Sequence, residues 1–283
     1  MFIQTYEEKY MRFPGGRTKA LIFSYDDGVE ADRRLIDLFK RYGLRGTFNL
    51  NSLLFDCREW HGRMDEEQTY KTFCNSPHEV ALHGARHVFL DKVPLPEGIN
   101  ELVRNRIYLE NKFNRIVRGF AYAYNAYTEE IVNMLPALGI AYARTTDSTL
   151  SFDLPRNFFK WNPTCHHNDP KLFELAEKFI SRSPNDELKH REPWLFYVWG
   201  HSYEFDDNGN WDIIENFADR VGGKNDIWYA TNIEIYEYVQ AYRSLVFSID
   251  GEMVYNPSAI PVWIELRGKV CKVEPAQSLR FDK

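Results

Sequence analysis

The chain has 283 residues, of which 44% are hydrophobic and 27% are charged, as in folded globular proteins rather than disordered ones. Its net charge of −6 is distributed along the chain without a basic stretch, which argues against a nucleic-acid partner. No apolar run approaches the ~20 residues that cross a bilayer, so no membrane partner is expected.

The first residues lack the apolar core of a secretory signal, and the four cysteines form no CxxC pair. We therefore expect a cytoplasmic protein with reduced thiols, although a trimmed secreted protein gives the same pattern. The sequence does not indicate an oligomeric state.

Short apolar runs alternate with amphipathic segments, which is the pattern of successive βα units. The pattern predicts strands over 20–25, 46–50, 78–83, 119–122, 140–144, 195–199 and 226–230, with a weaker one near 158–161. It predicts helices over 29–43, 96–117, 128–139 and 211–223, another from Asp169-Pro170 onward, and a last one over 232–245. Seven or eight such units predict an α/β fold in which a barrel-like parallel sheet is ringed by helices.

The residue pattern changes after about residue 245, where the alternation of predicted strands and helices ends. Apolar and polar residues alternate on both sides of Asp250-Gly251 and of Arg267-Gly268. Such dipeptides between alternating stretches are typical of β-hairpin turns. We therefore divide the chain into a barrel domain, 1–245, and a small β-hairpin appendage, 246–283. The segment 51–77 is polar and without periodicity, and we expect a loop over the active-site face there.

Polar residues fall where the predicted strands end. Asp26 and Asp27 end the first strand, His83 ends the third, Arg144 ends the fifth, and His201 follows the strand 195–199. Because the carboxyl ends of parallel barrel strands meet at one rim, these side chains are expected to gather there.

Two histidines four residues apart, His83 and His87, present their imidazoles on one side of a turn. Together with Asp27 they form a two-histidine, one-aspartate set that can hold a divalent ion with an open position. The motif is not that of zincins, because Gly84 stands where those enzymes have glutamate. A capped turn at Asp27 and two unrelated histidines remain the alternative.

His201 follows an apolar strand, where a single histidine is usually structural. An amide hydrolase needs a proton donor for its amine leaving group, and the near-neutral pKa of histidine suits that task. Its place on the same rim favours the catalytic interpretation.

The segment Ser24-Tyr25-Asp26-Asp27-Gly28, followed by the His-x-x-x-His pair at 83 and 87, resembles the polysaccharide deacetylase family. The similarity extends over roughly residues 18–245. It implies a distorted (β/α) barrel and a metal-dependent hydrolase that removes N-acetyl groups from an amino sugar in a polysaccharide or glycoconjugate.

The resemblance also implies roles for individual residues. Asp27, His83 and His87 would hold one divalent ion, with zinc expected and cobalt, nickel or manganese able to substitute. Asp26 would be the general base, and His201 would protonate the departing nitrogen.

Two positions depart from the family pattern. Ala121 stands where the third motif commonly has an arginine that pairs with the base, and we predict that Arg144 supplies this charge beside Asp26. Trp199 stands where the family tends to have leucine near the acyl pocket. Acetyl as the acyl group is therefore implied by the family and not by these residues.

Aromatic side chains near the predicted rim suit the faces of sugar rings, although core packing explains them equally well. The candidates for substrate binding are Tyr122, Tyr124, Trp161 and Trp199, and Tyr203 is a further aromatic that could stack on a sugar ring. The run from Trp161 to His167 also contains Cys165, His166 and His167, a weaker candidate for a second ligand cluster.

Two other functions remain open at this point. One is carbohydrate O-acetyl ester or small cyclic-amide hydrolysis, with the same residues acting on a different bond. The other is a non-catalytic glycan-binding homologue, which the missing third-motif arginine favours mildly.

Overall fold

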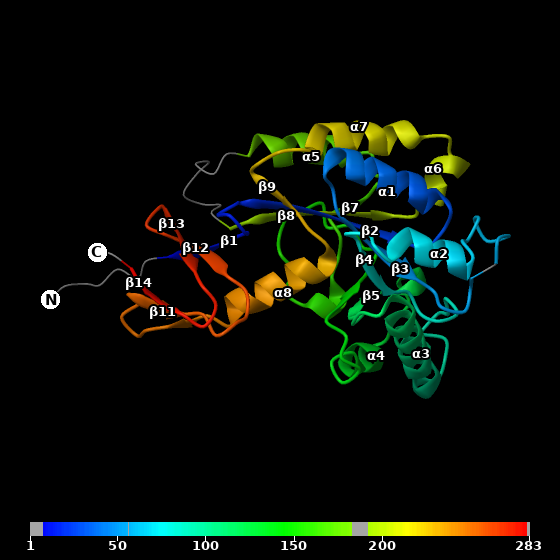
Figure 1. The fold of residues 1–283 in the computed structure, drawn as a ribbon, viewed down its shortest axis with the longest axis horizontal. Coiled ribbons are helices and arrows are strands. Elements are labelled where there is room, and N and C mark those ends of the chain that lie inside the picture. The colour runs from blue at the N-terminus through cyan, green and yellow to red at the C-terminus, as the bar shows by residue number, and fades with distance from the viewer. Residues whose placement is uncertain (1–7, 56, 183–191, 282–283) are drawn as a thin grey trace.

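A computed structural model describes residues 8–55, 57–182 and 192–281 of the chain. Its centre is a sheet in which every pairing is parallel (Figure 1). The strands of this sheet within the described ranges are β2 (Lys19–Asp26), β3 (Gly46–Leu50), β4 (Glu79–Leu82), β5 (Gly119–Ala121), β6 (Tyr142–Arg144), β7 (Cys165–His166), β8 (Trp194–Gly200) and β9 (Ile227–Tyr229). They follow the order β6-β5-β4-β3-β2-β8-β7, and β9 pairs with the start of β2.

The two ends of this sheet are brought together by the segment after β6. Trp161 pairs in parallel with Arg144 of β6, and four residues later Cys165 pairs with Val198 of β8. The sheet therefore curls into a distorted barrel, and the predicted fold class is confirmed.

Helices pack around the outside of the barrel (Figure 1). Within the described ranges they are α1 (Ala31–Tyr42), α2 (Glu66–Phe73), α3 (Leu95–Phe113), α4 (Glu129–Met134), α5 (Leu172–Ser181), α6 (Tyr203–Asp207), α7 (Trp211–Val221) and α8 (Asn232–Arg243), with 3₁₀ turns at Ala123–Asn125 and Phe158–Lys160. In α1, Leu35, Leu38 and Phe39 form the buried face, and Gly43 ends the helix with a φ of 67°.

Three local predictions were wrong or incomplete. The segment 51–77 contains α2, which begins with a capping box between Asp65 and Gln68. The weak strand near 158–161 is a 3₁₀ turn in which only Trp161 bridges to a strand. The short helix α6 was not predicted, because five residues carry too little periodicity.

Alternate residues of β2 pack on opposite sides of the sheet. Phe23 and Tyr25 lie in the core beneath the outer helices, where both rings contact Phe39 of α1. Ala20 and Ile22 belong to the inner core of the barrel. Asp26 ends the strand in the same alternation and so lies at the rim above the inner core.

The C-terminal region forms two antiparallel three-stranded sheets. One contains β10 (Val246–Phe247), β11 (Met253–Tyr255) and β14 (Ser278–Arg280), and the other contains β12 (Val262–Leu266), β13 (Lys269–Val273) and the N-terminal strand β1 (Lys9–Arg12). Both predicted hairpins are present; Arg267 and Gly268 join β12 to β13 with φ values of 54° and 75°. The participation of β1 was not expected.

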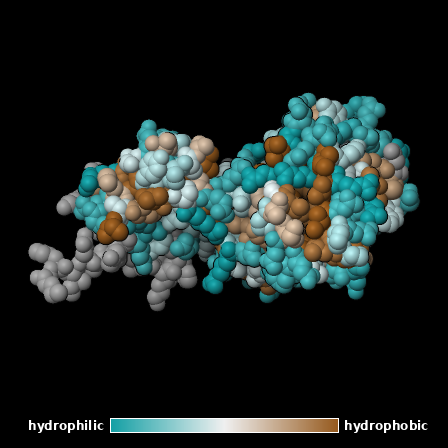
Figure 2. All heavy atoms as spheres, turned by 90° about the horizontal axis from the view of Figure 1, so that it is seen from below, coloured by the Kyte–Doolittle hydropathy of each residue, from teal (hydrophilic) through white to brown (hydrophobic). Residues whose placement is uncertain are grey.

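Figure 2 shows this appendage as a lobe beside the barrel, with apolar groups in separate patches on the face in view. Within the described ranges, no helix has both the length and the apolar character required to cross a membrane.

Candidate metal and acid–base site

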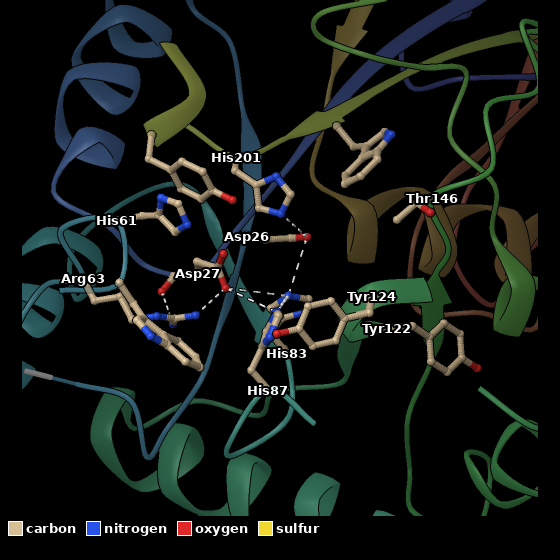
Figure 3. A pocket seen from close by; sticks show the side chains of 13 residues that line it. Asp26, Asp27, His61, Arg63, His83, His87, Tyr122, Tyr124, Thr146 and His201 are labelled. Atoms are coloured by element: carbon tan, nitrogen blue, oxygen red, sulfur yellow. Dashed lines mark hydrogen bonds and ion pairs between the residues drawn. The ribbon is translucent and has the colours of Figure 1, made fainter. Parts of the chain in front are cut away.

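The candidate residues gather at the carboxyl ends of the barrel strands (Figure 3). Asp26 is the last residue of β2, His83 directly follows β4, and Arg144 is the last residue of β6. His201 directly follows β8. The parallel sheet thus brings together side chains that are up to 175 positions apart in the sequence, as His201 and Asp26 are.

Asp27, His83 and His87 present three donor atoms that lie within 4.8 Å of one another. The Nε2 atoms of the two histidines are 3.0 Å apart. Asp27 Oδ1 is 3.9 Å from His83 Nε2 and 3.6 Å from His87 Nε2. The three residues predicted as metal ligands therefore point toward one common position.

Their hydrogen bonding suits a metal ion. His83 Nδ1 is 2.9 Å from the carbonyl oxygen of Ala121, which can only accept, so we assign the ring proton to Nδ1 and a lone pair to Nε2. Burial lowers the pKa of His83, and burial together with His83 lowers the pKa of His87 to about 3. Two neutral imidazoles whose Nε2 atoms face each other beside a carboxylate fit a divalent ion such as zinc.

Asp26 is held beside this triad. Arg144 Nη2 contacts Asp26 Oδ2, and Asn49 Nδ2 donates to Oδ1 at 2.7 Å. Burial alone would raise the pKa of Asp26, but interactions with Arg144 above all, and with His83, His201 and Asn49, outweigh it and lower the pKa to about 2. The carboxylate is therefore ionised at neutral pH and can accept a proton.

The predicted contact between Arg144 and Asp26 is thus present in the structure. Arg144 is 0% exposed, so its guanidinium orients Asp26 and does not reach a substrate. Its catalytic importance stays a prediction.

His201 lies between two carboxylates. Its Nε2 is 3.8 Å from Asp26 Oδ2, and its Nδ1 is 3.1 Å from Oε1 of Glu204, three residues later in α6. Burial lowers the pKa of His201, but Glu204 and Asp26 outweigh it, so the pKa lies above its ordinary value. The shift favours the protonated form of His201, which is the form a general acid needs.

The other oxygen of Glu204 faces a second histidine pair. Oε2 lies 3.1 Å from His166 Nε2 and 2.9 Å from His167 Nε2. Burial raises the pKa of Glu204, but its three histidine partners reverse that and hold the pKa far below the usual range. A Cβ at Gly200 would lie 2.0 Å from His167 Nδ1, so only glycine leaves room for this ring behind His201.

The site opens into a cavity of about 530 Å³, within the ~300–1,000 Å³ typical of small-ligand sites. Besides predicted residues, its walls include Trp60, His61, Arg63 and Thr146, and the predicted aromatic Tyr203 also lines it. The first three come from the segment expected to lie over the active-site face, but their residue types gave no specific signal. Glu204, which lies behind the wall, could have been found from its i, i+3 spacing to His201.

Two of the predicted substrate-binding aromatics have accessible surface in this cavity. Tyr124 is 51% exposed, stacks on Phe89 at a centroid distance of 3.8 Å, and contacts His87 edge-on at 4.4 Å. Trp199 lines the cavity and is covered on one face by the guanidinium of Arg144 at 4.6 Å. Both stay candidates for contact with a substrate.

The other two aromatics are corrected by the structure. Trp161 is 1% exposed and packs inside the barrel against Tyr142 and Tyr197, because its backbone bridges the two ends of the sheet. Tyr122 borders the cavity, but its ring is buried and its hydroxyl donates to the carbonyl oxygen of Phe159 (Figure 3). Neither ring has a free face for a sugar.

Comparison with known proteins agrees with the resemblance carried by the motifs. Residues 6–143 match the sequence model of the polysaccharide deacetylase family. The resemblance to the polysaccharide deacetylases is confirmed. No curated protein sequence matched the chain.

Solved structures of polysaccharide deacetylases and carbohydrate esterases share the fold. A putative polysaccharide deacetylase from Mycobacterium smegmatis superposes with a TM-score of 0.58 and 17% identity, covering 84% of this chain and 96% of that one. A family 4 carbohydrate esterase from Streptomyces lividans, in complex with acetate, gives a TM-score of 0.51 and 12% identity, covering 76% and 93%. At these identities the comparison establishes the fold alone.

Proposed function

We propose that the protein is a metal-dependent deacetylase that hydrolyses the N-acetyl group of an amino sugar in a glycan or glycoconjugate. The observation that carries this proposal is the convergence of Asp27, His83 and His87 next to an ionised Asp26 and a protonated His201. The match of residues 6–143 to the sequence model of a deacetylase family supports the reaction class.

In this proposal Asp27, His83 and His87 hold one divalent ion, with zinc expected from the nitrogen-rich ligand set. When bound, the ion would supply a Lewis acid for the acyl group and lower the pKa of water at the site.

Asp26 takes the proton of the attacking water, supported by its ionised state at neutral pH and its place 3.7 Å from His83 Nε2. Arg144 and Asn49 fix the direction of the Asp26 carboxylate. His201 Nε2 then gives its proton to the departing nitrogen, and Glu204 keeps the other ring nitrogen as a donor.

An amide substrate is favoured over an ester because the contacts of His201 favour its role as a general acid. An amine leaves only with a proton, whereas an alkoxide leaves more readily, and here the half-buried carboxylate of Glu204 raises the pKa of His201. Tyr124 and Trp199 at the cavity wall supply flat apolar surface for a sugar ring.

The proposal is tested first by metal analysis and acetate release. Purified wild type, His83→Ala and Asp27→Asn are compared by elemental mass spectrometry and by hydrolysis of N-acetylated and O-acetylated sugars. We expect about one zinc per chain and N-acetyl hydrolysis in the wild type, and loss of both in each variant. Preference for O-acetyl substrates would show that the enzyme cleaves an ester and not an amide. A chain that takes up no metal would overturn the proposal.

A further inference from the structure

The two turns that carry the metal-ligand candidates are both bonded to a third stretch of chain, residues 51–55 and 57–64. The amide of Leu53 donates to the carbonyl of Ala85 in the histidine turn at 2.9 Å. At the other end, the amide of Met64 donates to the carbonyl of Gly28 in the aspartate turn at 3.0 Å. The segment therefore spans from one turn to the other.

Arg63 makes the side-chain link to the aspartate turn. It is 4% exposed, and its Nη1 donates to the Asp27 carbonyl oxygen at 2.7 Å and to Asn51 Oδ1 at 2.8 Å. Its Nη2 donates to Asp27 Oδ1 at 2.6 Å. One guanidinium thus fixes both the backbone and the carboxylate of Asp27, as its planar arrangement of donors allows.

Asn51 completes the link to the histidine turn. Its Nδ2 donates to the carbonyl oxygens of His83, at 2.7 Å, and Gly84, at 2.9 Å. A continuous path of hydrogen bonds therefore runs from Asp27 through Arg63 and Asn51 to the backbone of His83.

The backbone of the ligand turns explains why such a link is needed. Asp27 has a φ of 86° and His87 a φ of 56°, in the left-handed region that side chains other than glycine rarely adopt. Such conformations persist only where surrounding contacts hold them. Arg63 supplies these contacts at Asp27, where it binds the carbonyl and the carboxylate together.

We propose that Arg63 and Asn51 form a clamp that presets the separation of Asp27 from His83 and His87 for a divalent ion. This inference rests on the proposed metal site and adds two positioning residues to it. The carboxylate of Asp27 has lone pairs enough to accept from Arg63 and still face the two imidazoles.

The positive charge of Arg63 gives two opposite predictions for the metal affinity of a variant that lacks it. A guanidinium against the ligand carboxylate opposes a dication by Coulomb repulsion, so charge alone predicts that its removal tightens metal binding. A clamp predicts the opposite sign, because Asp27 then loses its fixed orientation. Loss of partners of this kind weakens metal binding by about 10- to 100-fold.

The experiment compares wild type with Arg63→Met, Arg63→Lys and Arg58→Met. Arg58 lies on the same segment but is exposed and pairs with Asp65, so its variant is the matched control. Zinc affinity is measured by competition with a chelator, and the visible spectrum of the cobalt-loaded protein reports ligand geometry. Melting of the metal-free proteins shows whether each variant is folded.

We expect Arg63→Met and Arg63→Lys both to bind zinc about 10- to 100-fold more weakly with an altered cobalt spectrum, and Arg58→Met to match wild type. If Arg63→Met does not fold, Asn51→Ala and Arg63→Lys serve as the test, because both leave most of the packing in place. The two positions should also be non-additive in a double variant.

Zinc affinity equal to or above wild type in a folded Arg63→Met protein, with an unchanged cobalt spectrum, would overturn the clamp. Full rescue by lysine would also overturn it, because only the charge would then matter. A wild type that binds neither zinc nor cobalt would instead remove the proposed metal site itself.

Discussion

The barrel rim contains two histidine pairs with different chemistry. His83 Nδ1 faces a carbonyl oxygen, which draws the ring proton to Nδ1 and leaves a lone pair on Nε2. His166 Nδ1 instead accepts the backbone N–H of Asn168 at 3.2 Å, so its ring proton lies on Nε2, directed at Glu204. The backbone group at Nδ1 of His83 and of His166 decides whether that histidine can act as a ligand or as a donor.

Distance alone does not separate the two pairs. His166, His201 and Glu204 also present donor atoms within 4.8 Å of one another. Because the His166 Nε2 proton already points at the carboxylate, we interpret this second cluster as three imidazoles that stabilise one ionised Glu204. Cys165, the other candidate of that run, lies in the hydrophobic core. Spacing of metal-ligating residue types is therefore insufficient without the hydrogen bond at the far nitrogen.

The largest expected difference between the pairs is in metal binding and turnover. His83→Ala should lose the ion and reduce hydrolysis by about a thousand-fold or more, because a Lewis acid contributes several kcal/mol to such reactions. His166→Ala should keep about one zinc per chain and most of its activity. Zinc analysis with an acetate-release assay measures both, and loss of zinc from His166→Ala would show that the second pair is also a ligand pair.

A smaller effect is expected from His201, which links the pairs. His201→Asn retains a donor toward Glu204 but removes the proton at Nε2, so amide hydrolysis should fall by about 10²- to 10⁴-fold with zinc content unchanged. Hydrolysis of an activated acetyl ester should fall far less. Equal losses on the two substrates would argue against His201 as the acid for the leaving group.

The next effect concerns Glu204. Its charge holds the pKa of His201 above the ordinary value, and activity that needs protonated His201 disappears as pH rises through that pKa. Glu204→Gln should therefore move the basic limb of the kcat/KM profile to lower pH, with a loss of about tenfold on the alkaline side.

The matched control for Glu204 is Asp207→Asn, which removes the exposed partner of His61 from the same helix. Its profile should coincide with that of wild type. An unmoved basic limb in Glu204→Gln would mean that another group titrates there.

The last effect concerns the stability of the metal-free protein and not its activity. Burial lowers the pKa of His167 to about 4, below the ~6.5 of an unfolded histidine. The unfolded chain therefore takes up the proton first, and stability present above pH ~6.5 falls by up to ~3 kcal/mol as pH drops toward 4. His167→Gln should flatten this dependence in denaturant titrations with a chelator present.

His78 offers the control for that measurement. Burial lowers its pKa to about 4 as well, but its Nδ1 accepts the amide of Gly46, away from Glu204. His78→Asn should flatten the stability curve similarly while leaving the kcat/KM profile unchanged. A His167→Gln or His78→Asn protein whose stability has the same pH dependence as wild type would contradict the assignment of that histidine.

Much of the barrel could be predicted because its signals are local. Apolar runs such as 46–50 match β3 residue for residue, and the end of α1 at Gly43 follows from the left-handed conformation that glycine adopts there. Edges were harder: β7 has two residues, and β1 gives no hint that its partner, β12, lies at the other end of the chain. Pairing of that range depends on the assembled core.

Site residues that belong to short sequence motifs could be predicted. Residues that contact them only in the folded chain could not. Asp27 and the His83–His87 pair belong to recognisable motifs. Arg144 was predicted because Ala121 stands where the third family motif commonly has an arginine. Arg63 reaches Asp27 across 36 positions, and it comes from the polar segment 51–77, which has no periodicity. Trp161 was misassigned because an aromatic near a rim and one that fills the barrel have the same sequence signature.

The pairing of β1 with β12 has a consequence for synthesis of the chain. Arg12 lies opposite Trp263, so the first strand leaves the ribosome roughly 250 residues before its partner, a delay of about 12–50 s at ~5–20 residues per second. During that time β1 is an unpaired edge that other nascent chains can join. Ribosome-bound chains halted before β12 should therefore be more prone to aggregation than chains halted after it, with the appendage closing last.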